Sequence, residues 1–500
     1  MTRPFVLALA FLLACGGRAD PGAPLAVFSE GGRPRWEDPL PARTASFDGA
    51  RVRLRAARGE VLGLHVVRRG PGHEEISLEL AADDVRVDAF AVDHGRVSKP
   101  STSMYGGSRG RGRYADRLTP AAQPVAAERA AFFDLAVARD ATPGTRQGVL
   151  ELGESNIPVE LVIEDVELAD ITTAPRVWAY YDAKEIARAD GLTPGAATFD
   201  AERRYAALFR AHGAVASPEL TTESWTERRE LVAGLRFFPA LLPLACGELQ
   251  AEVRRWIALT QGSGQTPFAI PIDEPRRLRD QLRVRARAAC ARAGGGGPDR
   301  FLYAVTQQPS WLMGADVDVH ITPFGGNWTY NGTPPWAGAM VLDAADPGVR
   351  TWGVIGFRHD TPLWYVWDAM YWRDRYNKGR DQAPAHDLVA DPLTFDDGED
   401  HGNLDGVLVY PGALPSMRLK ALRRGAQDRA LLDALAACAG RPAADAIAAA
   451  LVPRSLGTAQ RGERTSWPTD DDAWEVTRHR VLDELVACRA RGAGPSSGSP

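Results

Sequence analysis

The sequence lacks the charge pattern of a nucleic-acid-binding protein. It has very few lysines, and its formal net charge is -5 at pH 7. Proteins that bind nucleic acid usually carry a basic patch or stripe that matches the phosphate backbone. We therefore expect no nucleic-acid partner, and we interpret the strong preference for arginine over lysine as a coding bias.

Common metal-binding motifs are also missing from the sequence. None of the five cysteines belongs to a Cys-x-x-Cys pair, and the nine histidines form no His-Glu-x-x-His motif. Those spacings are the usual signatures of zinc sites. The sequence therefore predicts no metal site and no cofactor.

An apolar run near the N-terminus is too short to cross a bilayer. Arg3 precedes the run at residues 5–14, and Cys15 follows it directly. A membrane-spanning helix needs about 20 apolar residues, whereas the core of a secretory signal needs about 7 to 15. The sequence Leu-Leu-Ala-Cys-Gly resembles the bacterial lipobox, in which the cysteine becomes the lipidated first residue of the mature protein.

This N-terminus predicts an exported protein. We expect residues 1–15 to be a lipoprotein signal peptide, residues 16–24 to be a tether, and Cys15 to be the lipidation site. The protein is then anchored to the bacterial cell envelope by its lipid alone, on the periplasmic or outer-membrane face. An ordinary signal peptide and a secreted protein are the alternative. Both locations permit disulfides among the remaining cysteines.

The 500 residues are 45% hydrophobic and 25% charged, which suits a globular protein of two domains. Residues 25–168 contain short alternating segments broken by Gly, Pro and Asp, a pattern typical of a β-sandwich. Within them, the Gly/Arg-rich residues 106–118 lack the Lys-Ser/Thr ending of a P-loop. We expect that stretch to be a mobile or interdomain loop with no anion site.

Beyond residue 175, apolar segments alternate with helical segments, which predicts a (β/α)8 barrel of the TIM type over residues 175–440. The expected strands cover residues 177–181, 214–220, 236–242, 267–272, 301–306, 317–324, 338–343 and 362–367. Apolar periodicity predicts helices from about residue 415, including a helical C-terminal extension at residues 441–490. Residues 491–500 are expected to be a disordered tail.

Two cysteines occupy similar places on the two amphipathic helices expected near the C-terminus. We therefore expect Cys438 and Cys488 to pair, whereas Cys246 and Cys290 are expected on separate helices of the barrel.

The stretch PFAIPIDEPRRLRD, residues 267–280, places two adjacent carboxylates where a strand stops and a helix starts. Asp273 and Glu274 follow the fourth expected strand, and Pro275 is expected at the first helical position. Active sites of such barrels lie at the carboxyl ends of the strands. Two neighbouring acids are expected to titrate as a coupled pair, as acid catalysis on a glycosidic bond requires. The alternative is that they only complement the positive end of the helix dipole.

Several motifs together resemble glycoside hydrolase family 123 and its uncharacterised relatives. They are AARGE (56–60), the strand-end Asp-Glu-Pro, WYVWDAMYW (364–372) and DGVLVYPG…PSMRLKALRRGAQD (405–428). The resemblance covers most of the mature chain and implies a retaining β-N-acetylgalactosaminidase that uses the 2-acetamido group of its substrate as the nucleophile. It implies that Asp273 orients the acetamide and that Glu274 acts as general acid and then base. This sequence departs from the family at residues 426–429, which we expect to brace the barrel.

Further substrate-binding residues are expected among the aromatic side chains. The candidates for the cup around the acetamide methyl and the pyranose ring are Trp364, Tyr365, Trp367, Tyr371 and Trp372. Trp367 and Trp372 match the family pattern best, although strand alternation turns about half of such residues away. Asp182 and Tyr410 are weaker candidates as partners of sugar hydroxyls, because such residues often act as caps or in turns.

These features predict an exported glycoside hydrolase that acts on a terminal β-linked 2-acetamido sugar of a carbohydrate or glycoconjugate. A glycosidase for a sugar without an acetamide is one alternative. A non-catalytic glycan-binding or scaffold lipoprotein on the same fold is the other.

Overall fold

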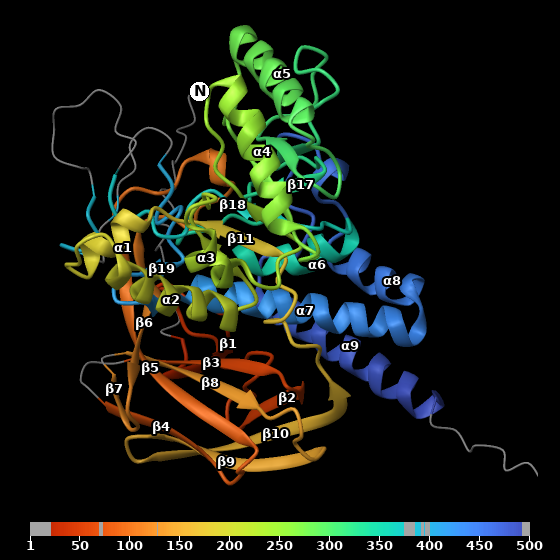
Figure 1. Ribbon diagram of the computed structural model, residues 1–500. Coiled ribbons are helices and arrows are strands. Elements are labelled where there is room, and N and C mark those ends of the chain that lie inside the picture. Colours follow the sequence, from red (N-terminus) through yellow and green to blue (C-terminus); the bar gives the residue numbers. More distant parts are fainter. Residues whose placement is uncertain are drawn as a thin grey trace, which may run out of the picture.

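The computed structural model of the protein describes residues 22–69, 74–127, 129–374, 386–391, 395 and 401–492 (Figure 1). The expected signal peptide, Cys15, most of the expected tether and most of the expected C-terminal tail lie outside the described residues. No helix of the described ranges combines the length and the apolar character needed to span a bilayer.

The N-terminal part forms two five-stranded sheets. One sheet contains, in spatial order, β1 (Leu25–Ser29), β3 (Val61–Arg68), β8 (Ala130–Val137), β5 (Val85–Val97) and β6 (Gly112–Ala121). The other contains β2 (Val52–Arg58), β10 (Ser155–Glu167), β9 (Gly144–Leu152), β4 (Glu74–Leu80) and β7 (Val125–Ala127). Neighbouring strands are antiparallel except for β10 and β2. Buried side chains of both sheets, among them Phe133 and Leu161, share one hydrophobic cluster.

The Gly/Arg-rich stretch is only partly a loop. Strand β6 begins at Gly112, so residues 106–111 form the loop and residues 112–118 belong to the sheet. Tyr114 and Leu118 are buried on β6. Because glycines and arginines dominate this stretch, its composition favoured a loop over a strand.

The next part is a nearly closed barrel of eight parallel strands, as predicted. The strands are β11 (Val177–Tyr180), β12 (Val215–Ser217), β13 (Phe237–Pro239), β14 (Thr266–Ala269), β15 (Leu302–Val305), β16 (Val319–Thr322), β17 (Trp328–Tyr330) and β18 (Trp364–Val366). Strands β18 and β11 pair, while β12 and β13 meet only at the bridge between Leu220 and Ala240.

The seventh strand is not the one expected. Residues 338–343 form no strand, and β17 (Trp328–Tyr330) takes that place in the barrel. The apolar residues of 338–343 are nevertheless buried. They lie against a distant part of the chain, where the Leu342 N–H donates to the Asn403 carbonyl over 2.8 Å. The apolar run therefore indicated burial correctly but not strand pairing.

Helices follow most of the barrel strands. They are α1 (Ala183–Ala189), α2 (Ala196–Ala211), α3 (Trp225–Arg228), α4 (Cys246–Thr260), α5 (Leu278–Ala293) and α6 (Thr351–Arg358). Short 3-10 turns are η1 (Ser103–Tyr105), η2 (Arg229–Val232), η3 (Gly348–Arg350) and η4 (Leu456–Thr458). The connections after β15 and β16, both fully described, contain no helix, so the expected alternation is incomplete there. These two connections are loops at the carboxyl edge of the barrel.

The C-terminal part is helical, as expected. After the short hairpin of β19 (Val409–Tyr410) and β20 (Leu414–Pro415), the chain forms α7 (Met417–Ala439), α8 (Arg441–Leu451) and α9 (Asp471–Gly492). In Figure 1, α7 runs between the N-terminal sheets and the barrel. The helix presents buried cations to acids of the sheets: Arg418 pairs with Asp116 over 2.8 Å, and Lys420 pairs with Asp134 over 2.6 Å.

Two disulfides connect helices. Cys438 and Cys488 join α7 to α9, which confirms the expected pair. Cys246 and Cys290, which were expected only on separate barrel helices, also pair and join α4 to α5. Helix α5 is the element that directly follows the two adjacent carboxylates.

Candidate active site

Asp273 and Glu274 lie on the loop between β14 and α5, at the carboxyl end of the fourth barrel strand. Both side chains are exposed to solvent. Helix α5 begins at Leu278, three residues later than expected, and its N-cap residue Arg277 makes no side-chain cap hydrogen bond. The two carboxylates therefore do not cap the helix, and the contacts give no support to the alternative interpretation.

A single hydroxyl holds both acidic residues. Thr306, immediately after β15, donates its hydroxyl hydrogen to Oδ1 of Asp273. The hydroxyl oxygen of Thr306 also accepts a hydrogen bond from the backbone N–H of Glu274 over 2.7 Å. Thr306 is only 8% exposed, so its side chain is held by the surrounding protein. Its two hydrogen bonds therefore fix the orientation of both residues of the pair.

The backbone turns sharply at Glu274. Its φ angle is +40°, in the left-handed region that non-glycine residues rarely occupy. Such strain is concentrated at functional sites, where surrounding contacts impose it. The turn breaks the alternation of an extended chain, which would send two adjacent side chains to opposite faces. The Glu274 carboxylate meets the exposed guanidinium of Arg276 over 2.6 Å.

Glu219 is a third carboxyl group of this region. It follows β12 by two residues and lies close enough to Asp273 for the two to interact electrostatically. Burial, and then the charge of Asp273, raise its pKa to about 7. A strand expected to run through residue 220 had placed Glu219 inside the sheet. Pro218 is the signal that ends β12 earlier and leaves Glu219 at the strand end.

Aromatic rings line the barrel next to the acids. Tyr365 stacks on Tyr330, with ring centroids 5.1 Å apart, and on Trp178, with centroids 4.6 Å apart. Burial raises the pKa of the Tyr330 hydroxyl, and the charges of Asp273 and Glu274 raise it further. Tyr330 and Tyr365 are therefore neutral hydrogen-bond donors beside the carboxylates.

Trp367, another of the predicted aromatic residues, donates its backbone N–H to the side chain of Asn331 over 3.0 Å. Its indole N–H donates to Asp405 over 3.2 Å, and the hydroxyl of Tyr105 donates to the same carboxylate over 3.1 Å. Tyr371 packs on Trp367, with ring centroids 5.1 Å apart, but is almost fully buried, and its hydroxyl donates to Asp374.

Three other predicted residues have contacts within the fold. Trp372 is fully buried, and its indole N–H donates to the Val409 carbonyl over 2.7 Å. The hydroxyl of Tyr410 donates to Asp116 over 2.7 Å within the α7 ion-pair network. Asp182 is the N-cap of α1. None of the three lines the cavity described next, and their role in substrate binding stays a prediction.

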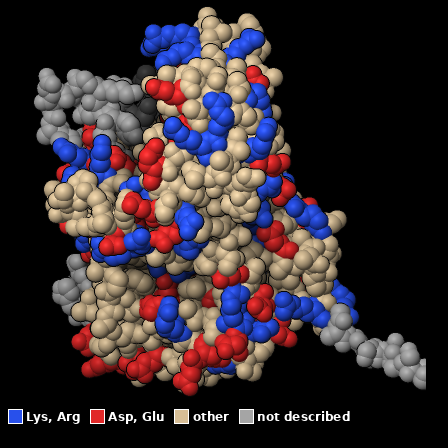
Figure 2. Space-filling model, viewed as in Figure 1, with Lys and Arg blue, Asp and Glu red and all other residues tan. Residues whose placement is uncertain are grey.

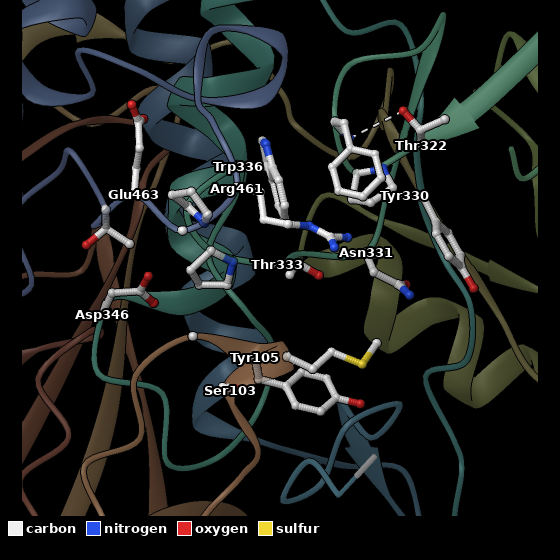
Figure 3. A pocket seen from close by; sticks show the side chains of 18 of the residues that line it. Ser103, Tyr105, Thr322, Tyr330, Asn331, Thr333, Trp336, Asp346, Arg461 and Glu463 are labelled. Atoms are coloured by element: carbon white, nitrogen blue, oxygen red, sulfur yellow. Dashed lines mark hydrogen bonds between the residues drawn. The ribbon is translucent and has the colours of Figure 1, made fainter. Parts of the chain in front are cut away.

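A cavity of about 1130 Å³ opens beside Glu274 and Thr306 (Figure 3). Its walls come from three parts of the chain: the carboxyl edge of the barrel, the loop around η1, and residues 461–469 between η4 and α9. Tyr330 and Trp336 supply aromatic walls, and Asn331 and Thr333 supply polar ones. Apolar surfaces with a few polar groups are typical of a small-molecule or saccharide site.

Within the described residues, no group of three or more His, Cys, Asp or Glu side chains is arranged to hold a metal ion.

The fold and the site thus define a parallel barrel with paired carboxylates at its carboxyl edge. No protein-family model matches the chain, and no curated protein matches it. Among solved structures, the chain is similar to a family 123 glycoside hydrolase from Clostridium perfringens, a protein studied for glycolipid glycan hydrolysis. The TM-score is 0.58 at 9% identity, over 94% of this chain and 99% of that one.

A second similar structure is a glycosyl hydrolase family 2 member from Bacteroides cellulosilyticus, with a TM-score of 0.26 at 11% identity, over 63% of this chain and 44% of that one. A TM-score this low does not indicate a shared fold. The resemblance to family 123 glycoside hydrolases is therefore shown at the level of the fold, and it extends across nearly the full length of both chains.

Proposed function

We propose that the protein is a glycoside hydrolase that removes a terminal β-linked 2-acetamido sugar with assistance from the substrate. The observation that carries this proposal is the pair of solvent-exposed carboxylates, oriented by one buried hydroxyl at the carboxyl edge of the barrel. The similarity to the fold of a family 123 glycoside hydrolase supports it.

The two carboxylates have separate tasks in this mechanism. Asp273 accepts a hydrogen bond from the acetamide N–H and so directs the acetamide oxygen toward the anomeric carbon. As that oxygen forms its bond, the glycosidic bond breaks, and Glu274 gives its proton to the departing oxygen. Glu274 then takes a proton from the water that opens the cyclic intermediate. The substrate supplies the nucleophile, so the usual spacing rules for two enzyme carboxylates do not apply.

The position of the pair also bears on the two alternatives. Exposed carboxylates beside a large cavity favour an enzyme over a scaffold, because such cavities are the usual places of substrate binding. A glycosidase for a sugar without an acetamide would use Asp273 only as an electrostatic stabiliser. Activity on paired substrates with and without the acetamide distinguishes that alternative.

The test compares two variants on aryl glycosides whose leaving groups differ in pKa. Glu274→Gln should slow substrates with poor leaving groups by about 10²- to 10⁴-fold, whereas substrates that leave without a proton should retain much of their rate. Asp273→Asn should slow all acetamido substrates by a similar factor, because its role does not depend on the leaving group.

Asp280→Asn is the matched control, since Asp280 is an acid in the first turn of α5 and lies away from the pair. It should leave kcat within about twofold of wild type. If the protein cleaves no aryl glycoside, or if both variants of the pair retain their rates, the proposed mechanism is wrong.

A further inference from the structure

The acidic residues that line the cavity already have partners. Glu274 pairs with Arg276 over 2.6 Å, and Glu463 pairs with Arg454 over 3.3 Å. Asp346 is buried and accepts hydrogen bonds from an indole N–H and a backbone N–H. Burial also raises the pKa of the Asp346 carboxyl. The negative charge of the cavity wall is therefore largely compensated.

Two arginines of the wall are not compensated. Arg461 and Arg464, both exposed, make no ion pair or hydrogen bond with any residue that the structure describes. Figure 3 shows the side chain of Arg461 extending into the cavity, with its guanidinium directed toward Asn331. This guanidinium faces the cavity, and its hydrogen-bond donors are available to a ligand.

The surface that leads to the site is basic as well. Helix α5, which follows the carboxylate loop, carries five arginines and a single acidic residue, Asp280. Figure 2 shows Lys and Arg side chains gathered at the top of the molecule, where Figure 1 places α5, and acidic side chains gathered at the bottom, over the N-terminal sheets. Such a gradient steers anions toward the site.

We propose that the outer part of the cavity binds an anionic group, a carboxylate or a sulfate, on the saccharide to which the cleaved sugar is attached, and that Arg461 is its ligand. This inference rests on the proposed function, because it assigns the substrate class of the same site. A guanidinium binds carboxylates and sulfates through two parallel hydrogen bonds, and it gives much less to a neutral hydroxyl.

The experiment uses disaccharides that share one cleavable acetamido sugar and differ in the second sugar, which is neutral, carries a carboxylate, or carries a sulfate. Arg461→Gln should raise KM for one or both anionic substrates by about 10- to 100-fold, as expected for the loss of a charged hydrogen bond. KM for the neutral substrate should change by less than about twofold, and kcat should change little for all three. The two anionic arms show which group is recognised.

Arg236→Gln is the matched control, because Arg236 is exposed just before β13, at the amino end of the barrel, and its loss removes the same charge. Affinities of the same disaccharides for Glu274→Gln, with and without Arg461→Gln, give a readout that needs no turnover. Arg461-dependent binding, together with no cleavage of any of the disaccharides by the wild type, would support this inference and contradict the proposed function. Equal binding of neutral and anionic disaccharides, or affinities that Arg461→Gln leaves unchanged, would overturn it.

Discussion

The ionisation of Glu219, beside the carboxylate pair, is expected to make the stability of the protein depend on pH. Its folded pKa is about 7, because burial and the charge of Asp273 both oppose its ionisation. In the unfolded chain a glutamate has a pKa of about 4.3. The protonated form is thus favoured by folding, so the stabilisation is complete below the unfolded pKa and is lost as the pH rises through the folded pKa.

We therefore expect the free energy of unfolding of the wild type, relative to Glu219→Gln, to fall by about 2 to 3 kcal/mol between pH 5 and pH 8. The comparison with Glu219→Gln removes the contributions of all other titrating groups. Urea unfolding at the two pH values measures it. Glu248→Gln, an exposed change in the first turn of α4, should show no such difference. A wild type and a Glu219→Gln variant with parallel pH profiles would contradict the assignment.

At the residue scale, the sequence identified the carboxylate pair but not the groups that position it. Asp273 and Glu274 stand out because they follow a proline-flanked apolar run and precede a helical pattern. Thr306 is a lone threonine at the end of another strand, and nothing in its neighbourhood marks it. Its role depends on two parallel strands lying side by side, which is a property of the folded barrel.

At the scale of elements, the predicted number of eight barrel strands is confirmed, but the strand predicted at residues 338–343 is wrong. The run at residues 338–343 is more apolar than β17, so hydrophobicity alone favoured it. Strand β17 has three residues and lies between glycine- and asparagine-rich turns, where local propensity is weak. It joins the barrel because β16 and β18 leave space for one more strand between them.

The disulfide between α4 and α5 holds the helix that follows the loop of Asp273 and Glu274. It closes a loop of 44 residues, and the second disulfide closes one of 50. Loops of that size correspond to about 4 kcal/mol each in the chain-entropy model. We expect Cys246→Ser/Cys290→Ser and Cys438→Ser/Cys488→Ser each to lower the free energy of unfolding by about 2 to 4 kcal/mol in urea titrations.

Each disulfide variant serves as the reference for the other, because the two loops are nearly equal in length. Fully reactive thiols in the unreduced wild type would show that the bonds do not form. An unchanged unfolding free energy in both variants would contradict the expected stabilisation.

At the scale of the whole molecule, α7 connects the sheets to the barrel through buried ion pairs. Arg424 pairs with Glu60 over 2.6 Å, and Arg478 of α9 pairs with the same carboxylate over 2.8 Å. The charges of both arginines lower the pKa of Glu60 against the opposing effect of burial. The partners are more than 300 residues apart in sequence, so no local pattern could have predicted them.

We expect Glu60→Gln to lower the free energy of unfolding by about 3 to 5 kcal/mol at pH 7, because two buried guanidinium groups lose their shared counter-ion. Since the folded pKa of Glu60 is lowered, its contribution is present at neutral pH and is lost as the pH falls through that folded pKa. Denaturant titration measures the change. Glu37→Gln, which breaks an exposed pair with Arg113, should cost no more than about 1 kcal/mol. If the two substitutions lowered the free energy of unfolding equally, burial would not determine how much these ion pairs contribute to stability.

The buried cations of α7 bear on how this protein can evolve. Proteins whose domains are joined only by a linker can exchange a domain by recombination, because each domain keeps its own stability. Here a replacement for the N-terminal sheets would have to present acids to Arg418, Lys420, Arg423 and Arg424 at the same positions, because each unmatched buried charge costs several kcal/mol. The sheets and the barrel are therefore expected to be inherited together, and chimaeras joined near residue 170 should fail unless Glu30, Glu60, Asp116 and Asp134 have counterparts in the incoming module.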